Sequence, residues 1–134
     1  MAHHFRKHYT VTEARALLPH IRVWLKQLDA TRQRMEKCDQ RLSQMLAGGD
    51  ALGGELVNHW VRALADLKQL LLEFQKREIQ IKDLDRGLID FPALVGGKEV
   101  FLCWEQDEED IEFWHDLESG YAGRERLKPG NAEE

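Results

Sequence analysis

Apolar residues recur at alternating steps of three and four along the first third of the chain, and this pattern constrains the fold most. Nine of the eleven positions reached in this way are apolar, which predicts a long helix packed against another helix at a shallow angle. Thr10 and Glu13 have the spacing of a capping box and mark the start of the helix. Pro19 removes one backbone hydrogen bond, so we expect a kink or a local break there. The predicted seam comprises Val11, Ala14, Leu18, Ile21, Leu25, Leu28, Arg32, Met35, Asp39, Leu42 and Leu46.

A glycine-rich segment, residues 47–54, predicts the end of this helix and a reversal of the chain. A second run of the same spacing predicts a second helix, antiparallel to the first. Large apolar side chains beside both seams cannot all be buried between two helices, so the C-terminal third or a second copy of the chain must cover them. The second seam comprises Val57, Trp60, Leu64, Leu67, Leu71 and Phe74, and the side chains beside the seams are Leu17, Trp24, Val61, Leu70 and Leu72.

From residue 79 the apolar period changes to two, which predicts short strands at 79–82, 88–94 and 98–104. Gly96 and Gly97 predict a hairpin turn between the last two strands. Pro92 cannot donate to a ladder, which places its strand at an edge or at a bulge. The sequence therefore predicts an α+β fold in a single domain, 1–126. A long antiparallel, coiled-coil-like helical hairpin covers 10–78, a small antiparallel sheet with a short helical or loop segment is docked on it over 79–126, and 127–134 form a polar tail.

The charge distribution and the two cysteines indicate the class of protein. Residues 1–46 carry nine basic and four acidic side chains, whereas residues 105–134 carry three basic and eleven acidic ones. The basic side chains are scattered around the first helix, so the pattern favours internal pairing or pairing across a dimer over nucleic-acid binding. No apolar run is long enough to cross a bilayer, which predicts a cytoplasmic protein without membrane contact. Cys38 and Cys103 are expected to be reduced thiols.

Several short motifs resemble the DUF2203 family, bacterial proteins of unknown function. The stretches "YTVTEARALLP", "DLDRGLIDFP", "VFLCW" and "FWHDLESGYAGR" carry the resemblance, which extends over most of the chain. Asp107 stands where the family usually has a glycine, although Glu108 fits the glutamate that follows. The resemblance implies a small prokaryotic cytoplasmic protein and brings no activity, cofactor or substrate with it. The matching positions are Gly87, Leu88, Asp90, Phe91, Pro92, Leu102, Cys103, Trp104, Trp114, His115, Gly120, Gly123 and Arg124.

Residues 100–127 contain the side chains from which a site could be built. Thiolate, imidazole and carboxylate are competent ligands for a divalent metal, and Glu112 and His115 have a Glu-x-x-His spacing that would share one helix face. Cys103 and His115 could also act as nucleophile and base, but a cysteine within an apolar strand is more often inert. The candidate metal ligands are Cys103, Glu112 and His115; the candidate ligand-binding residues are Asp90, Cys103, Trp104, Glu108, His115 and Arg124.

A structural role is the alternative for each of these residues. His115 would then bond a carboxylate, and Arg124 would pair with the acidic run from Glu105 to Glu118, which we favour. His3, His4 and His8 precede the helix and are expected to be frayed. The leading interpretation is a non-enzymatic interaction or scaffold module that acts as a homodimer without a cofactor. The alternative is a binding protein or an enzyme that holds a metal or a small molecule around Cys103 and His115.

Overall fold

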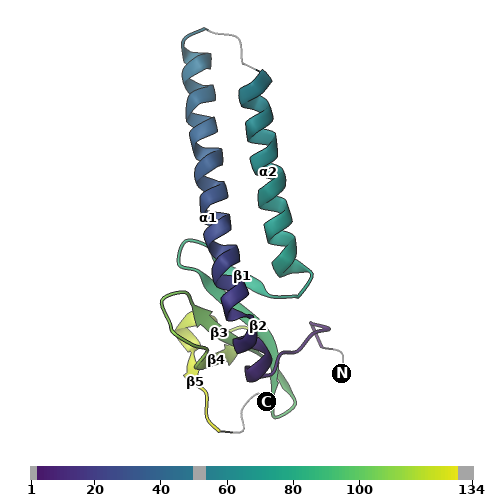
Figure 1. Ribbon diagram of the computed structural model, residues 1–134. Coiled ribbons are helices and arrows are strands. Elements are labelled where there is room, and N and C mark those ends of the chain that lie inside the picture. Colours follow the sequence, from purple (N-terminus) through teal and green to yellow (C-terminus); the bar gives the residue numbers. More distant parts are fainter. Residues whose placement is uncertain (1–2, 50–53, 130–134) are drawn as a thin grey trace. The chain divides into compact units, whose positions relative to one another are not determined.

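The computed structural model describes residues 3–49 and 54–129 and has an α+β fold (Figure 1). The predicted fold class is thus confirmed, and no described helix is long and apolar enough to cross a membrane. Residues 50–53 of the predicted glycine turn and 130–134 of the predicted tail lie outside the described residues. The elements are α1 (Val11–Ala47), α2 (Gly54–Gln75), β1 (Gln80–Asp83), β2 (Leu88–Val95), β3 (Lys98–Glu105), β4 (Phe113–Asp116), the 3-10 helix η1 (Tyr121–Gly123) and β5 (Glu125–Arg126).

Helix α1 begins at the predicted capping box. The Thr10 hydroxyl accepts a hydrogen bond from the Glu13 amide at 3.0 Å, and the Glu13 carboxylate accepts one from the Thr10 amide at 2.9 Å. The two bonds satisfy amides that have no partner within the helix. α1 then continues without interruption past Pro19, so the predicted local break does not occur. Pro19 is exposed, and only one backbone hydrogen bond is lost there.

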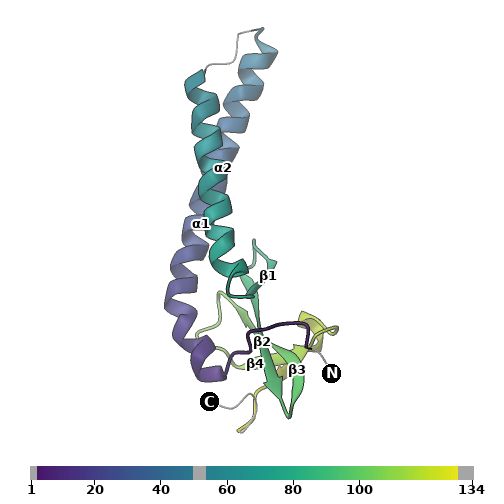
Figure 2. The same cartoon turned by 90° about the vertical axis from the view of Figure 1, so that its right-hand side faces the viewer.

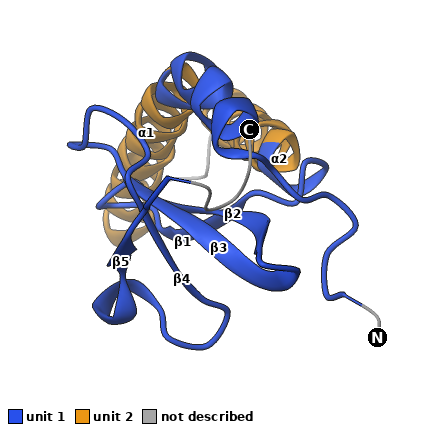
Figure 3. Cartoon of the chain, turned by 90° about the horizontal axis from the view of Figure 1, so that it is seen from below, with its two compact units in different colours: residues 1–22, 74–134 blue, residues 23–73 orange. Residues whose placement is uncertain are grey.

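The chain divides into two compact units (Figure 3), which are described separately below. Residues 1–22 and 74–134 form the first unit, and residues 23–73 form the second. The first turns of α1 thus belong to the same compact unit as the sheet.

The second unit is a pair of antiparallel helices, the later part of α1 and most of α2, which lie side by side (Figures 1 and 2). An ion pair joins them, with Arg34 Nη1 at 2.9 Å from Asp66 Oδ2. The seam follows the predicted positions as far as Leu28 and then departs from them, because Thr31 and Cys38 are buried while Asp39 is exposed. This part of α1 pairs with α2 within the second unit, and the buried stripe takes a different path around the helix from the predicted one.

The first unit contains one antiparallel sheet with the strand order β1-β2-β3-β4-β5. The three predicted strands are confirmed, with Gly96 and Gly97 in the turn between β2 and β3. Strands β4 and β5 add to the same side of β3, so residues 100–127 supply part of the sheet itself rather than only a cover for it. β3 is central and buried, as its two apolar faces predict.

Pro92 lies in β2, an interior strand, so the prediction of an edge strand is wrong for the strand as a whole. The pairing between β1 and β2 ends at Asp90, however, and the described backbone of β2 beyond that point has no β1 partner. There the Pro92 carbonyl accepts a hydrogen bond from the Tyr9 amide at 2.7 Å. Proline is tolerated because its missing N–H would point toward this locally open side.

The first turns of α1 cover one face of the sheet. Tyr9, just before the helix, packs edge-on against Phe91 at 5.6 Å between ring centroids, and the Arg22 guanidinium lies 4.9 Å from the centre of the Trp104 ring. Trp104 pairs with Ile89, which is two residues before Phe91 in β2, so Phe91 and Trp104 lie on the same face of the sheet. The opposite face therefore carries Asp90, Cys103 and their cross-strand neighbours.

Substitution of Gly87 by alanine should destabilise the fold by about 1–3 kcal/mol. Gly87 has φ of 64°, and a Cβ there would lie 2.6 Å from the Gln106 side chain. Chemical denaturation followed by circular dichroism measures the loss. Gly96→Ala is the matched control, because φ is 59° and nothing lies within 4 Å of its Cβ. Equal losses in the two variants would show that the Gln106 contact contributes nothing.

Candidate functional site

Three polar side chains from three adjacent strands are buried on the sheet face opposite α1. Asp90 of β2 lies directly across from Cys103 of β3, and His115 of β4 pairs with Phe101, two residues before Cys103. Side chains two residues apart on a strand share a face, which makes His115 a diagonal neighbour of Cys103. Antiparallel pairing thus brings together residues separated by up to 25 positions in sequence.

His115 uses both ring nitrogens. Its Nδ1 donates to the Asp116 backbone carbonyl at 2.6 Å, because a carbonyl can only accept, and its Nε2 lies 3.0 Å from Asp90 Oδ2. Both side chains are only 2% exposed. Burial alone would lower the pKa of His115, but the hydrogen bonds to Asp90 and Asp116 outweigh it and leave the pKa raised. The raised pKa favours the protonated form of His115, in which the two side chains make a buried ion pair.

Cys103 lies beside this pair but is not a reactive thiol. Burial, followed by the negative charge of Asp90, raises the pKa of the Cys103 thiol. A nucleophilic cysteine requires the thiolate, which this environment disfavours. The geometry therefore gives no support to the hypothesis that Cys103 and His115 act as nucleophile and base.

The buried pair leaves one oxygen without a partner. Asp90 Oδ1 is buried and has no hydrogen bond with any part of the chain that the structure describes. One donor atom each from Asp90, Cys103 and His115 lies within 4.8 Å of the others. Carboxylate, thiol and imidazole in this arrangement can hold either a shared proton or a metal ion.

Glu108 and Arg124 form a second, partly buried pair near Cys103. Arg124 Nη2 donates to Glu108 Oε2 at 2.5 Å, and the guanidinium is stacked 3.9 Å from the centre of the Phe113 ring and 4.5 Å from that of Tyr121. The predicted ion pair between Arg124 and the acidic run is confirmed. Phe113 lies directly across from Cys103, so the guanidinium stacked on its ring lies near the three buried donors.

Trp104 and Glu112 do not join the other candidates. Trp104 follows Cys103 in β3 and so points to the α1 face, where its Nε1 donates to the Glu108 carbonyl at 3.0 Å. The prediction that Glu112 and His115 share a helix face is wrong, because His115 lies in strand β4 and Glu112 lies just before that strand, so no helix contains the two residues. Glu112 is exposed, and its Oε2 lies 3.9 Å from Arg126 Nη1.

An interaction that sequence reasoning missed is centred on Glu99 of β3. Its carboxylate accepts hydrogen bonds from the backbone amides of His4 and Phe5, at 2.8 and 3.0 Å, and lies 2.8 Å from His8 Nε2. Phe5 also packs on Phe101, with 5.4 Å between the ring centroids. The described N-terminal segment is thus held against the sheet, and the prediction that it frays is wrong for residues 4–8. A glutamate directly before the apolar run of β3 was the available signal.

A family comparison extends over nearly all of the described sheet and helices. The family model described as "Uncharacterized conserved protein (DUF2203)" matches residues 7–127. The chain belongs to the DUF2203 family. Neither the curated proteins nor the solved structures searched gave a match. Every candidate site residue lies within the matched range, so the buried donors are part of the DUF2203 domain.

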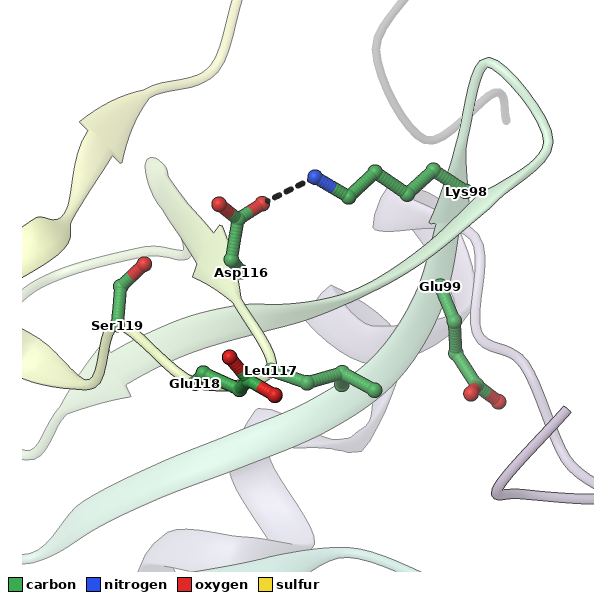
Figure 4. Close-up of a pocket in the computed structure, with 6 residues that line it drawn as sticks. All are labelled: Lys98, Glu99, Asp116, Leu117, Glu118 and Ser119. Atoms are coloured by element: carbon green, nitrogen blue, oxygen red, sulfur yellow. Dashed lines mark hydrogen bonds and ion pairs between the residues drawn. The ribbon is translucent and has the colours of Figure 1, made fainter.

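The sheet unit of this DUF2203 protein also contains a surface hollow of about 390 Å³, lined by residues 98, 99 and 116–119 (Figure 4). Lys98 Nζ lies 3.0 Å from Asp116 Oδ1, so its positive charge is already paired. A hollow of this volume could hold a small ligand, but small-molecule binding sites usually direct several polar side chains toward the ligand. Here the Glu99 carboxylate is instead engaged by the N-terminal segment. The hollow therefore does not carry a site.

Glu99→Gln in the DUF2203 chain should lower the free energy of unfolding by about 1–3 kcal/mol near neutral pH. Burial alone would raise the pKa of Glu99, but hydrogen bonds from His8, His4 and Phe5 outweigh it and hold the pKa at about 2. The carboxylate therefore stabilises the fold fully above its ordinary pKa of 4.5, and this contribution disappears as the pH falls toward 2.

Denaturation of the wild type and Glu99→Gln between pH 7 and pH 2 measures this contribution. The difference between the two proteins should shrink as the pH falls below about 4.5. Glu118→Gln, at an exposed position, is the control and should change stability little at any pH. A difference that stays constant down to pH 2.5 would contradict the account of Glu99.

Proposed function

We propose that this DUF2203 protein is a non-enzymatic interaction module that acts as a cytoplasmic homodimer through an exposed apolar stripe on α2. The observation that carries the proposal is the exposure of large apolar side chains on one side of this helix. Soluble chains rarely leave such side chains grouped together unless a partner covers them. The proposed partner is a second copy of the chain.

The α2 stripe consists of Val57, Val61, Leu64, Leu71 and Leu72. Four of these side chains are 36–50% exposed, and Leu64 is half-buried. Val57, Val61 and Leu64 are separated by four and three residues, and Leu71 follows Leu64 by seven, so they share one helix face. This face is distinct from the buried face of α2 that includes Ala63, which supports its being free to bind a partner.

The arrangement of apolar side chains allows the α2 stripe of one chain to pack against the same stripe of a second chain. Val57 and Val61 lie in the N-terminal half of α2, Leu71 and Leu72 lie in the C-terminal half, and Leu64 lies between them. An antiparallel α2 from a second chain would bring the valine end of one helix opposite the leucine end of the other. Two-fold dimers require this kind of self-complementary surface. Lys68 lies within the stripe, where its aliphatic stem can cover apolar surface while its charge remains in water.

The thiols support the non-enzymatic and cytoplasmic parts of the proposal. Cys38 and Cys103 are both free and buried, as in proteins of reducing compartments. The raised pKa of Cys103 disfavours nucleophilic chemistry at the most polar part of the sheet.

Sedimentation velocity on Val61→Glu/Leu71→Glu tests the proposal. Two carboxylates within the α2 stripe should convert the dimer to a monomer of 15.6 kDa, because burying unpaired charges in an apolar interface is costly. Circular dichroism should show unchanged helix content, since both positions are exposed in the single chain.

Leu46→Glu is the matched control, because Leu46 is an exposed leucine of α1 outside the α2 stripe. This variant should remain a dimer. A wild type that sediments as a monomer, or a double variant that remains a dimer, would overturn the proposed interface.

A further inference from the structure

We propose that Asp90, Cys103 and His115 together bind one divalent transition-metal ion, and that their chemistry selects Zn²⁺. This inference is independent of the proposed dimer, because all three residues belong to the sheet unit and the α2 stripe does not. It also replaces the metal site expected from the sequence, in which Glu112 stood in place of Asp90.

The separations of the donor atoms suit one ion. The three atoms lie within 4.8 Å of one another, and His115 Nε2 is 3.0 Å from Asp90 Oδ2. Bonds of ~2.0–2.3 Å from a tetrahedral zinc place its ligands roughly 3.3–3.7 Å apart. Small side-chain rotations on adjacent strands bridge the difference. The ion would take the place of the hydrogen that now lies between His115 and Asp90.

His115 is already oriented as a metal ligand requires. Its Nδ1 donates to the Asp116 backbone carbonyl at 2.6 Å, which fixes the ring and turns Nε2 toward Asp90. Histidines that bind metals commonly donate their other ring nitrogen to a carbonyl or carboxylate in this way. The hydrogen bond to Asp116 would therefore persist in the metal-bound form.

Asp90 provides a second, independent indication of a ligand. Its side chain is 2% exposed, yet Oδ1 has no hydrogen-bond partner among the residues that the structure describes. An unsatisfied buried carboxylate oxygen is costly, and such atoms call for a specific explanation. Coordination of a cation by the carboxylate would remove this cost.

The donor set also balances the charge of the ion. One carboxylate, one thiolate and a neutral imidazole leave a divalent ion with no net charge, as burial requires. Binding releases two protons to solvent, the thiol proton of Cys103 and the Nε2 proton of His115, because an atom that bonds to the metal must first be deprotonated. A thiolate together with an imidazole favours Zn²⁺ over Mg²⁺ and Ca²⁺, which prefer oxygen ligands. Three protein ligands leave the fourth tetrahedral position to water.

Titration with Co²⁺ alone provides a spectroscopic test. Co²⁺ occupies tetrahedral zinc sites, and a cobalt–thiolate bond gives a charge-transfer band in the near ultraviolet. The protein is a tag-free, metal-stripped His3→Ala/His4→Ala variant, because His3, His8 and Glu99 form another possible group of ligands. Both substituted side chains are exposed, and the backbone bond from His4 to Glu99 does not need the side chain.

Cys38→Ser in the same background assigns the thiolate without any substitution in the site. The chain has two cysteines, so a band that survives this change must come from Cys103. We expect the band to saturate at one Co²⁺ per chain, to persist in Cys38→Ser and to disappear when one equivalent of Zn²⁺ is added. Cys103→Ser, which keeps the side-chain size, should abolish the band.

Absence of the band in the folded background variant would overturn the proposal. Loss of the band in folded Cys38→Ser, or retention of it in Cys103→Ser, would do the same. If Cys103→Ser fails to fold, the result for Cys38→Ser decides the question alone.

Discussion

Asp90→Ala should lower the free energy of unfolding by about 3–5 kcal/mol, because it leaves the charge of His115 buried without its partner. The pair is almost completely buried, with 3.0 Å between His115 Nε2 and Asp90 Oδ2. Urea denaturation of the metal-free protein in EDTA, followed by circular dichroism, measures the loss. EDTA separates the contribution of the ion pair from that of any bound metal.

Two further variants make this expectation specific. Asp116→Asn removes a carboxylate that forms an exposed ion pair with Lys98, and should cost less than about 1 kcal/mol. Adding His115→Leu to Asp90→Ala removes the unpaired charge of the imidazole and should recover part of the lost stability. If Asp90→Ala costs no more than Asp116→Asn, the buried pair does not stabilise the fold.

Trp104→Ala should cost about 3–5 kcal/mol, the range expected when a large buried aromatic side chain is removed. Trp104 is fully buried on the α1 face of the sheet, and its ring lies beneath the Arg22 guanidinium. The substitution leaves a cavity and also deprives the Glu108 carbonyl of its hydrogen bond from Nε1. Thermal and chemical denaturation should both show the loss.

Trp104→Phe and Trp114→Ala serve as controls for this prediction. Trp104→Phe keeps most of the apolar volume and should cost less than the alanine variant, with the loss arising chiefly from the missing hydrogen bond. Trp114 is only half-buried in β4, so its removal should also cost less. Equal losses for Trp104→Ala and Trp114→Ala would contradict the assignment of Trp104 to the core.

Local sequence signals predicted much of the fold. Thr10 and Glu13 predicted the start of α1 because their capping bonds involve neighbours in sequence. Alternating apolar residues and a glycine pair predicted β2 and β3. The seam beyond Leu28 was missed because it depends on which element packs against that part of α1. β4 was missed because four residues are too few to distinguish a strand from a helix by period.

The candidate site was predictable in its residue types but not in its geometry. The excess of acid around Arg124 predicted an ion pair, although only the fold selects Glu108 as the partner. Asp90, Cys103 and His115 were all proposed from the sequence, yet their convergence requires the register of three strands. The register of β4 brings His115 close to Cys103 and Asp90, whereas Glu112 precedes the strand and is exposed.

Native mass spectrometry of the untagged wild type tests the central claim, that this DUF2203 protein is a homodimer, most directly. The account predicts a main species of twice the 15.6 kDa chain mass at low micromolar concentration. It also predicts that Val61→Glu/Leu71→Glu gives single chains under the same conditions. A wild-type spectrum that contains only single chains over the whole accessible concentration range would contradict the claim.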